Sequence, residues 1–447
     1  MVRSLPNWEC LITAQHNNNK VRRYLALLAL VVAGESIFLL PFVLSRVFRP
    51  VFLDVFEITN LQLGTAFSLY GVIAMVSYFA GGPLADRFEV RRLLAIALLA
   101  TSAAGVVMAT IPTLGVLTLL YGIWGLTTIF LFWAALIKTT RELGDSNQGL
   151  AFGVLDGGRG LFAAVLASLS VMLFAALLPA DVESASFEQR ADALSTIIMI
   201  YSGMGVCSAL LVWLFIPGGK SSPSQADPHA QSFTLQGLKK VMGMRAVWLQ
   251  ALIILCAYVA YKSTDNFSLY ARDAFGYDDV AALSLGTISF WMRPVAAIGA
   301  GLLADRLNCF TMLLISFAIV MFGNAIMAAG LIAPGVPLIL MLTVAGTSAG
   351  IYALRGLYFA VMGETKIPLI YTGSAVGLVS FVGFTPDIFM GPLMGYLIDN
   401  SPGAAGHQQL FAVIFVFALF GFLASLLFRY SESEAADAAS PAPQMQT

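Results

Sequence analysis

Long apolar runs separated by short polar segments cover almost the whole chain. A bilayer core needs about 20 apolar residues per helix, because each helical residue rises only about 1.5 Å. Runs of that length predict twelve membrane-spanning helices, at residues 22–46, 60–82, 92–111, 114–137, 148–178, 193–216, 246–271, 280–303, 309–331, 335–361, 370–397 and 408–429. The pattern therefore predicts an all-α polytopic membrane protein.

Three polar segments divide these runs. Residues 1–21 predict a cytoplasmic N-terminal tail, and residues 431–447 predict a solvated, disordered tail. The middle segment, residues 217–245, is rich in Pro, Ser and Gly, as a linker would be. It separates a predicted six-helix bundle at residues 22–216 from a second one at residues 246–430.

Basic residues favour one side of this arrangement. If the N-terminus lies inside, sixteen Lys and Arg residues fall in inner segments and only four in outer segments, namely Arg46, Arg49, Arg190 and Arg272. Lys and Arg are enriched in cytoplasmic loops. We therefore expect both termini and the linker to face the cytoplasm.

The composition and the motifs exclude several classes of protein. The chain is 59% hydrophobic and 11% charged, whereas soluble domains carry about 25% charged residues. The formal net charge of −1 argues against a nucleic-acid binder. The spans hold no His, Cys or acidic cluster with catalytic or metal-ligand spacing, so we expect no enzyme, catalytic residue, metal or cofactor. The sequence has no GxxxxGK[ST] motif, which favours an ion gradient over ATP as the energy source.

A short phrase occurs once in each predicted bundle, as GGPLADRF at residues 81–88 and AGLLADRL at residues 300–307. Each copy follows the second span of its bundle. The arrangement resembles the major facilitator superfamily, whose loop phrase is Gly, any residue, Leu, Ala, Asp and Arg, with basic residues after it. The positions that carry the resemblance are Gly82, Asp86, Arg87, Arg91 and Arg92 in the first half and Gly301, Asp305 and Arg306 in the second, where the following basic residues are missing.

The resemblance implies twelve helices in two pseudo-symmetric bundles, with a cavity between them. For the repeated phrase it implies a gate latch between the halves; the alternative is a topological signal and a tight turn. A glycine lets two helices approach closely, and a charged pair at a helix end can cap or bridge a neighbour. Other phrases, such as DGGRGLFAAV at residues 156–165, resemble a YihN-type branch of bacterial inner-membrane proteins, which indicates no substrate.

Ionisable residues inside the spans are functional candidates, because an unpaired charge in lipid costs several kcal/mol. Glu35 lies near the middle of the first span, as a proton- or substrate-coupling residue or as the structural partner of an arginine. Arg159 follows Asp156 by three residues, so this pair neutralises itself or Arg159 faces the cavity. Arg293 is a candidate anion contact, or a hydrogen-bond donor between helices.

The other candidates lie in the second half. Arg355 has no carboxylate within one helical turn, so it requires an anionic substrate or a partner such as Glu364. Lys262 and Asp265 are one turn apart and can pair. Asp387 could face one of the arginines at 159 and 293, or be a second protonation site. Three aromatic residues are weaker candidates for substrate contact: Trp133, Tyr261 and Tyr352.

The spans carry four candidate cations and four candidate acids, which permits full pairing and argues against a strongly anionic cargo. The sequence therefore predicts a secondary transporter for a small organic solute, anionic or zwitterionic, coupled to H⁺. The alternatives are a proton-coupled drug or metabolite efflux antiporter and a sensor with a transporter fold. We expect a monomer in the lipid bilayer, with the solute and H⁺ as its partners.

Overall fold

The computed structural model describes residues 8–144, 148–218, 235–358 and 372–439, without the side chains at residues 8–21, 79–80, 148–149, 235–238, 297–298, 300–302, 304–306, 372–374 and 431–439. Every regular element in these ranges is a helix. Eleven helical segments in the described part are long and apolar enough to cross a membrane. In addition, α13 (Asp279–Leu307) has 29 residues and lies where the eighth span was predicted. The prediction of an all-α polytopic chain is confirmed.

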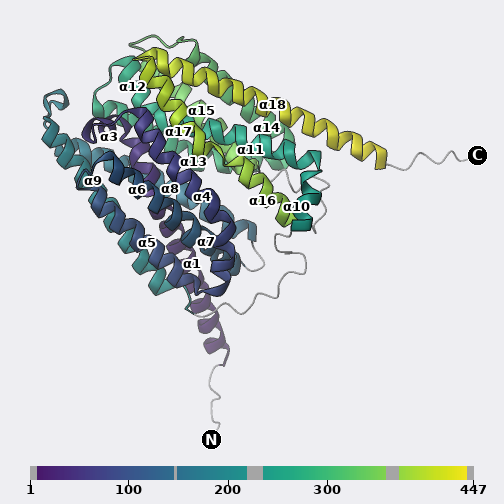
Figure 1. The fold of residues 1–447 in the computed structure, drawn as a ribbon. Helices are drawn as coiled ribbons and strands as arrows, with labels where there is room; N and C mark the ends of the chain where they lie inside the picture. Colours follow the sequence, from purple (N-terminus) through teal and green to yellow (C-terminus); the bar gives the residue numbers. More distant parts are fainter. Residues whose placement is uncertain (1–7, 145–147, 219–234, 359–371, 440–447) are drawn as a thin grey trace, which may run out of the picture.

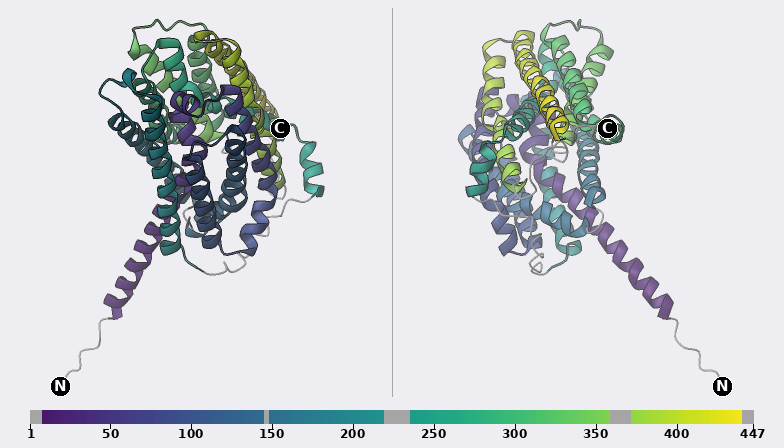
Figure 2. Two further views of the ribbon diagram at one scale, coloured as in Figure 1. Left: turned by 60° about the vertical axis from the view of Figure 1, so that its left-hand side comes forward. Right: turned by 90° about the vertical axis from the view of Figure 1, so that its right-hand side faces the viewer.

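The helices fall into two groups that lie side by side (Figure 1). The first half of the chain contains α1 (Trp8–Phe38), η1 (Leu39–Leu44), α2 (Ser45–Val47), α3 (Arg49–Val55), α4 (Asn60–Arg87), α5 (Val90–Met108), α6 (Leu114–Gly125), η2 (Leu126–Trp133), α7 (Ala134–Gly144), α8 (Gln148–Leu177), η3 (Val182–Ser184) and α9 (Phe187–Phe215). The second half contains α10 (Leu235–Met242), α11 (Arg245–Ser263), η4 (Thr264–Asn266), α12 (Phe267–Phe275), α13, α14 (Cys309–Ala328), α15 (Pro337–Leu357), α16 (Thr372–Gly383), α17 (Pro386–Asn400) and α18 (Ala404–Ala439). Figure 2 shows α1 running out of the bundle toward the N-terminus.

Several spans are interrupted where they pass the centre of the molecule. The first span continues from α1 through the π-helical η1, which contains Pro41, into α2 and α3. Proline lacks an N–H and disturbs the preceding helical turn, so an α-helix changes its hydrogen-bond pattern there. The fourth span contains the π-helical η2, and the seventh contains the 3₁₀ turn η4. Irregular backbone at membrane depth is tolerated where protein, rather than lipid, surrounds it.

This continuation of the first span changes the position of two arginines. The sequence counted Arg46 and Arg49 with the outer segments, at and just after the end of the first predicted span, but both lie in short helices and are buried, with 5% and 1% of their surface exposed. Arg49 donates hydrogen bonds from Nε and Nη2 to Asn60 Oδ1, at 3.2 and 3.1 Å. The apolar run ends at these residues, but the helical segments continue past them. The length of the apolar run therefore predicted an exposed environment for two arginines that are buried.

The two halves meet at the end of the bundle opposite the chain termini. There, Asp399 of α17 accepts hydrogen bonds from the backbone N–H groups of Asn60 (3.2 Å) and Leu61 (2.8 Å), at the start of α4. The first N–H groups of a helix have no partner within the helix, and its N-terminus favours a negative charge. Asp399 therefore caps a helix of the other half. Two ion pairs join the halves at the same end: Arg272–Asp54 (2.7 Å) and Arg190–Asp279 (3.5 Å).

Small residues bring α4 and α17 into backbone contact along this junction. A Cβ added to Gly391 would lie 2.6 Å from the Gly64 carbonyl oxygen, and one added to Gly71 would lie 2.6 Å from the Asp387 carbonyl oxygen. Real Cβ atoms do not come this close to backbone atoms. Close approach of helices through small residues is typical of membrane interfaces. In this structure the molecule is therefore closed at the end opposite its termini.

Candidate functional site

A cavity of about 300 Å³ lies between the two halves, within the range of small-molecule pockets. Residues of α1, η1, α2, α4, η2 and α8 line it from the first half, and residues of α11, α13, α15 and α17 from the second. Much of its wall is aromatic: Phe38, Phe42, Tyr70, Tyr78, Trp133, Tyr258, Tyr261, Phe290, Tyr352, Tyr358 and Phe384.

Most residues that the sequence singled out for substrate binding or coupling meet in this cavity. Eight of the ten line it: Glu35, Arg159, Arg293, Arg355, Asp387, Trp133, Tyr261 and Tyr352. The remaining two, Lys262 and Asp265, are buried and pair with residues of the wall. The charged groups of the lining are the arginines at 46, 159, 293 and 355 and the carboxylates at 35, 156 and 387.

Glu35 is the centre of one charge cluster. Its carboxylate lies 3.3 Å from Arg159 Nε and 3.3 Å from Arg293 Nη1, and the residue is only 3% exposed. Arg293 also places Nη2 3.2 Å from Asp156 Oδ1. Asp156 thus forms its ion pair with Arg293 across the halves, instead of with its helical neighbour Arg159. The rings of Phe38 and Trp133 also face the Arg159 guanidinium, at 5.5 and 5.7 Å.

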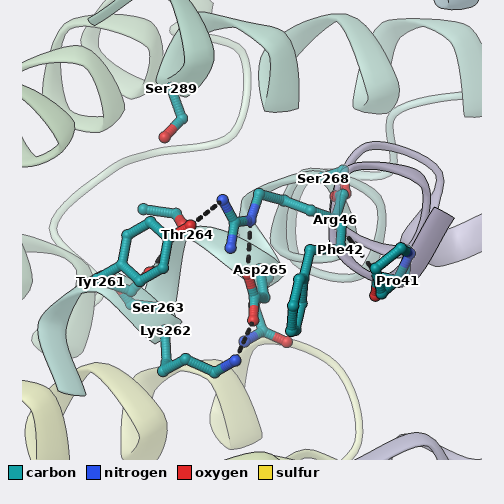
Figure 3. Close-up of polar contacts among 12 residues, drawn as sticks. Pro41, Phe42, Arg46, Tyr261, Lys262, Ser263, Thr264, Asp265, Ser268 and Ser289 are labelled. Atoms are coloured by element: carbon teal, nitrogen blue, oxygen red, sulfur yellow. Dashed lines mark hydrogen bonds and ion pairs between the residues drawn. The ribbon is translucent and has the colours of Figure 1, made fainter. Parts of the chain in front are cut away.

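A second charge cluster lies between α2 and α11–α12 (Figure 3). Arg46 Nε contacts Asp265 Oδ1 at 2.6 Å, and Lys262 Nζ lies 3.5 Å from Asp265 Oδ2. Lys262 also lies 3.4 Å from Asp387, which accepts hydrogen bonds from the Tyr258 hydroxyl at 3.0 and 3.1 Å. Asp387 therefore faces Lys262, and not the arginines at 159 or 293. The cluster joins the halves, because Arg46 belongs to the first and its partners to the second.

Arg355 has a different environment. Its guanidinium carbon lies 3.9 Å from the centroid of the Tyr261 ring and 6.0 Å from that of Tyr258. Arg46 also lies over the Tyr261 ring, at 4.6 Å, and donates to its hydroxyl at 2.9 Å. Within the described part of the chain, Arg355 forms no ion pair with a carboxylate; Glu364, which the sequence offered as a partner, lies outside it. A cation held against an aromatic face retains its capacity for an anion.

Among the residues that hold the charged groups of this site, the sequence did not single out Arg46 or Tyr258; most of the aromatic lining was not predicted either. Arg46 was counted with the outer segments because the apolar run stops there. A signal was present: Glu35 and Arg46 are eleven residues apart, which is close to three helical turns and places both on one helix face. Tyr258 carried no such signal, because an aromatic residue in a membrane span is usually a packing or interface residue.

The repeated phrase makes its contacts within the first half. Asp86 is exposed and lies 2.8 Å from Lys138 Nζ of α7, while Arg87 is exposed at the end of α4. Arg91 and Arg92 both pair with Glu89, at 3.0 and 2.6 Å. Within the described part of the chain, Asp86, Arg87, Arg91 and Arg92 therefore form no bridge between the halves. The side chains of the second copy, with Gly301, Asp305 and Arg306, lie outside the described residues.

The glycine that permits close approach in this phrase is not the one that the resemblance indicated. A Cβ added to Gly82 would have no described neighbour within 4 Å, whereas one on Gly81 would lie 3.2 Å from the carbonyl oxygens of Ile129 and Phe130 in η2. Gly81, the first residue of the phrase, is thus the position at which α4 packs tightly against the fourth span.

Known proteins share both the sequence pattern and the fold. The family model of the Major Facilitator Superfamily matches residues 25–389. The inner membrane protein YqcE of Escherichia coli is 28% identical over 425 residues, covering 91% of this chain and 96% of that protein. The inner membrane protein YihN of the same organism is 24% identical over 413 residues, covering 89% and 93%.

Solved transporters have a similar fold. A single-residue mutant of the nucleoside transporter NupG has a TM-score of 0.70 at 15% identity, covering 91% of this chain and 99% of that one. A bacterial homologue of the human lysosomal transporter Spinster, in an inward-facing and unoccupied conformation, has a TM-score of 0.66 at 16% identity, covering 94% and 99%. These matches show the fold, and the family model shows a multi-span transporter and not an enzyme. With the family model spanning most of its helices, the chain belongs to the Major Facilitator Superfamily.

Proposed function

We propose that this transporter moves a small organic anion or zwitterion by alternating access to the central cavity, in symport with a proton. The observation that carries the proposal is the position of Arg355, which faces the cavity over the Tyr261 ring and forms no ion pair with a described carboxylate. A charge in such a setting is costly without a counter-ion. A substrate carboxylate would satisfy the guanidinium through two parallel hydrogen bonds.

The walls of the cavity favour an organic solute over a small inorganic ion. Aromatic side chains offer apolar area to a carbon skeleton, and tyrosine hydroxyls offer hydrogen bonds to its polar groups. Four tyrosines line the cavity: Tyr78, Tyr258, Tyr352 and Tyr358. Tyr352 and Tyr358 are close to Arg355 in the sequence, and the Tyr258 ring lies 6.0 Å from its guanidinium carbon. A volume of about 300 Å³ limits the cargo to a small molecule.

Glu35 is the proposed proton site. Its carboxylate is the counter-ion of both Arg159 and Arg293. A proton on Glu35 would remove that negative charge and leave two guanidinium groups available to an anionic substrate. Because binding linkage is reciprocal, the substrate would in turn favour protonation of Glu35. Proton and anion would therefore bind together, which is the condition for symport.

We further propose that the protein is a monomer in a bacterial inner membrane, with both termini in the cytoplasm. The excess of Lys and Arg in the segments on the terminal side supports this orientation, and the two relatives from E. coli are inner membrane proteins. With this orientation, the end closed by Asp399 and Arg272 faces outward, and the structure is an inward-facing state.

The test is uptake into proteoliposomes. A panel of labelled carboxylates, amino acids and uncharged sugars would be offered with and without an inside-alkaline gradient. We expect gradient-driven accumulation of an acid or zwitterion, strongly reduced in Arg355→Gln and unchanged in Arg429→Gln, which removes an exposed arginine far from the cavity. Accumulation of uncharged solutes alone would refute the anion proposal. Stimulation by a gradient of the opposite direction would indicate an antiporter instead.

A further inference from the structure

A second cavity, of about 580 Å³, lies at the terminal end of the first half, apart from the central one. Four helices meet around it: α1 contributes Arg22 and Arg23, α5 contributes Arg91, α7 contributes Glu142, and the end of α9 contributes Leu214 and Phe215. Among the described residues of this pocket, three arginines thus accompany one carboxylate, and none of them takes part in the proposed transport cycle.

Contacts with the protein hold Arg23 and Arg91 in place without neutralising all three arginines. Arg23 donates from Nη2 to the Gly144 carbonyl at 2.7 Å, and within the described residues Arg22 and Arg23 form no ion pair. Arg91 pairs with Glu89 at 3.0 Å and lies over the Trp213 ring at 4.6 Å. Among the described residues, its other terminal nitrogen, Nη1, has no hydrogen-bond acceptor. A site with several guanidinium groups and spare donors suits a phosphate, whose oxygens accept paired hydrogen bonds.

The rim of the pocket is apolar and faces outward. Leu214 is 72% exposed and Phe215 is 36% exposed, and Tyr24, one residue after the arginine pair of α1, is 68% exposed. In a membrane-spanning bundle, such side chains on the outside of α1 and α9 contact acyl chains. The arginines of the pocket therefore lie at the level of the lipid headgroups, and Leu214 and Phe215 lie toward the acyl chains of the bilayer. Its volume is many times the ~30 Å³ that one water molecule occupies, so a whole headgroup has room.

We propose that this pocket binds the phosphate group of an anionic phospholipid, with the acyl chains along Leu214 and Phe215. Basic pockets between helices on the cytoplasmic side are the type of site that recognises anionic headgroups. The lipid would connect the ends of α1, α5, α7 and α9, all within the first half, and would thereby stabilise that half. This proposal is independent of the identity of the transported solute.

The test is a lipid titration of the purified, delipidated full-length protein in detergent, read as the Tm. Phosphatidylglycerol, phosphatidylcholine and inorganic phosphate would be added separately. We expect phosphatidylglycerol to raise the Tm of the wild type and the other two to have little effect. Arg22→Gln should weaken the apparent affinity for phosphatidylglycerol about tenfold, as expected for the loss of one charge-assisted hydrogen bond, and Arg91→Gln by at least as much.

Arg245→Gln is the matched control, because Arg245 is exposed at the terminal end of the other half and lies outside the pocket. It should respond to phosphatidylglycerol as the wild type does. Arg91 packs over Trp213, so Arg91→Gln could fail to fold for that reason alone. Arg22→Gln replaces an exposed side chain and would then still test the proposal. Equal effects of the two lipids, a full effect of inorganic phosphate alone, or a normal response of Arg22→Gln would each overturn the proposal.

Discussion

Arg293 of α13 reaches across the molecule to Glu35 of α1, with Nη1 3.3 Å from the carboxylate. The contact lies in the cavity wall and joins the two halves of the chain. The charge on the Glu35 carboxylate thus affects both the binding site and the contact between the halves. Removing that charge would at once free a cation for substrate and weaken a contact between the halves.

Glu35→Gln should separate transport from the proton gradient. Glutamine has the shape and the neutral charge of protonated glutamate, so the arginines remain available to the substrate but no proton can be carried. We expect gradient-driven accumulation to be lost, while the rate of exchange of labelled for unlabelled substrate stays within about threefold of the wild type. A threefold change corresponds to a free-energy difference of less than ~0.7 kcal/mol. Both fluxes are measured in the same proteoliposomes.

Asp156→Asn is the comparison for that experiment, because Asp156 also pairs with Arg293 but is more exposed than Glu35. This variant should keep gradient-driven uptake. If Glu35→Gln accumulates substrate as the wild type does, or if both variants lose coupling alike, the assignment of the proton to Glu35 is wrong.

Arg355 should be more sensitive to the geometry of its side chain than to its charge alone. Arg355→Gln removes the proposed substrate contact, and a charge-assisted hydrogen bond contributes ~1.5–3 kcal/mol, so KM should rise at least tenfold. Arg355→Lys keeps the charge but loses the planar fork that matches a carboxylate, so its KM should lie between the two. Substrate-induced quenching of tryptophan fluorescence would give the Kd of each variant. A Kd unaffected by Arg355→Gln would exclude this residue from the binding site.

The apolar pattern was sufficient to predict the number and type of the membrane helices, because run length alone decides whether a helix can span lipid. It was not sufficient for Arg46. Irregular turns such as η1 depend on the helices that surround them, which a single run of sequence does not contain. An arginine at the end of an apolar run therefore has two possible environments, and only the packing against α11 and α13 decides between them.

Pairing of the charges was predictable only where the partners share one helix. Lys262 and Asp265 lie one turn apart in sequence, and their side chains lie 3.5 Å apart in the structure. Asp156 and Arg159 have the same spacing, but Asp156 forms its ion pair with Arg293, which is 137 residues away. Helical spacing shows which pairs are possible; a partner from another helix then competes for the same carboxylate.

Asp265 should contribute more to stability than a carboxylate at the surface. It is 3% exposed and lies between Arg46 and Lys262, so Asp265→Asn would leave buried Arg46 without its carboxylate partner and buried Lys262 with Asp387 alone. Breaking a buried pair in this way costs about 3–5 kcal/mol. Arg272→Gln breaks the more exposed Arg272–Asp54 pair, at the end of the molecule opposite the termini. It should lower the free energy of unfolding by at most ~1 kcal/mol. The Tm of the two purified variants in one detergent compares them, and equal losses would contradict the importance of burial.

Glycine substitutions should distinguish the junction of α4 and α17 from the repeated phrase. Gly391→Ala would place a Cβ 2.6 Å from the Gly64 carbonyl oxygen, so the helices must separate, at a cost of ~1–3 kcal/mol. We expect a lower Tm and greater labelling of a cysteine introduced at the closed end. Gly82→Ala meets no described neighbour within 4 Å and lies in a helix, where alanine is favoured over glycine by ~1 kcal/mol, so its Tm should not fall. Transport by Gly82→Ala then tests this glycine in the opposite state, when the halves close at the terminal end. A loss of flux at an unchanged Tm would mean that Gly82 is needed in that state. Normal flux would leave Gly82 without a role in gating.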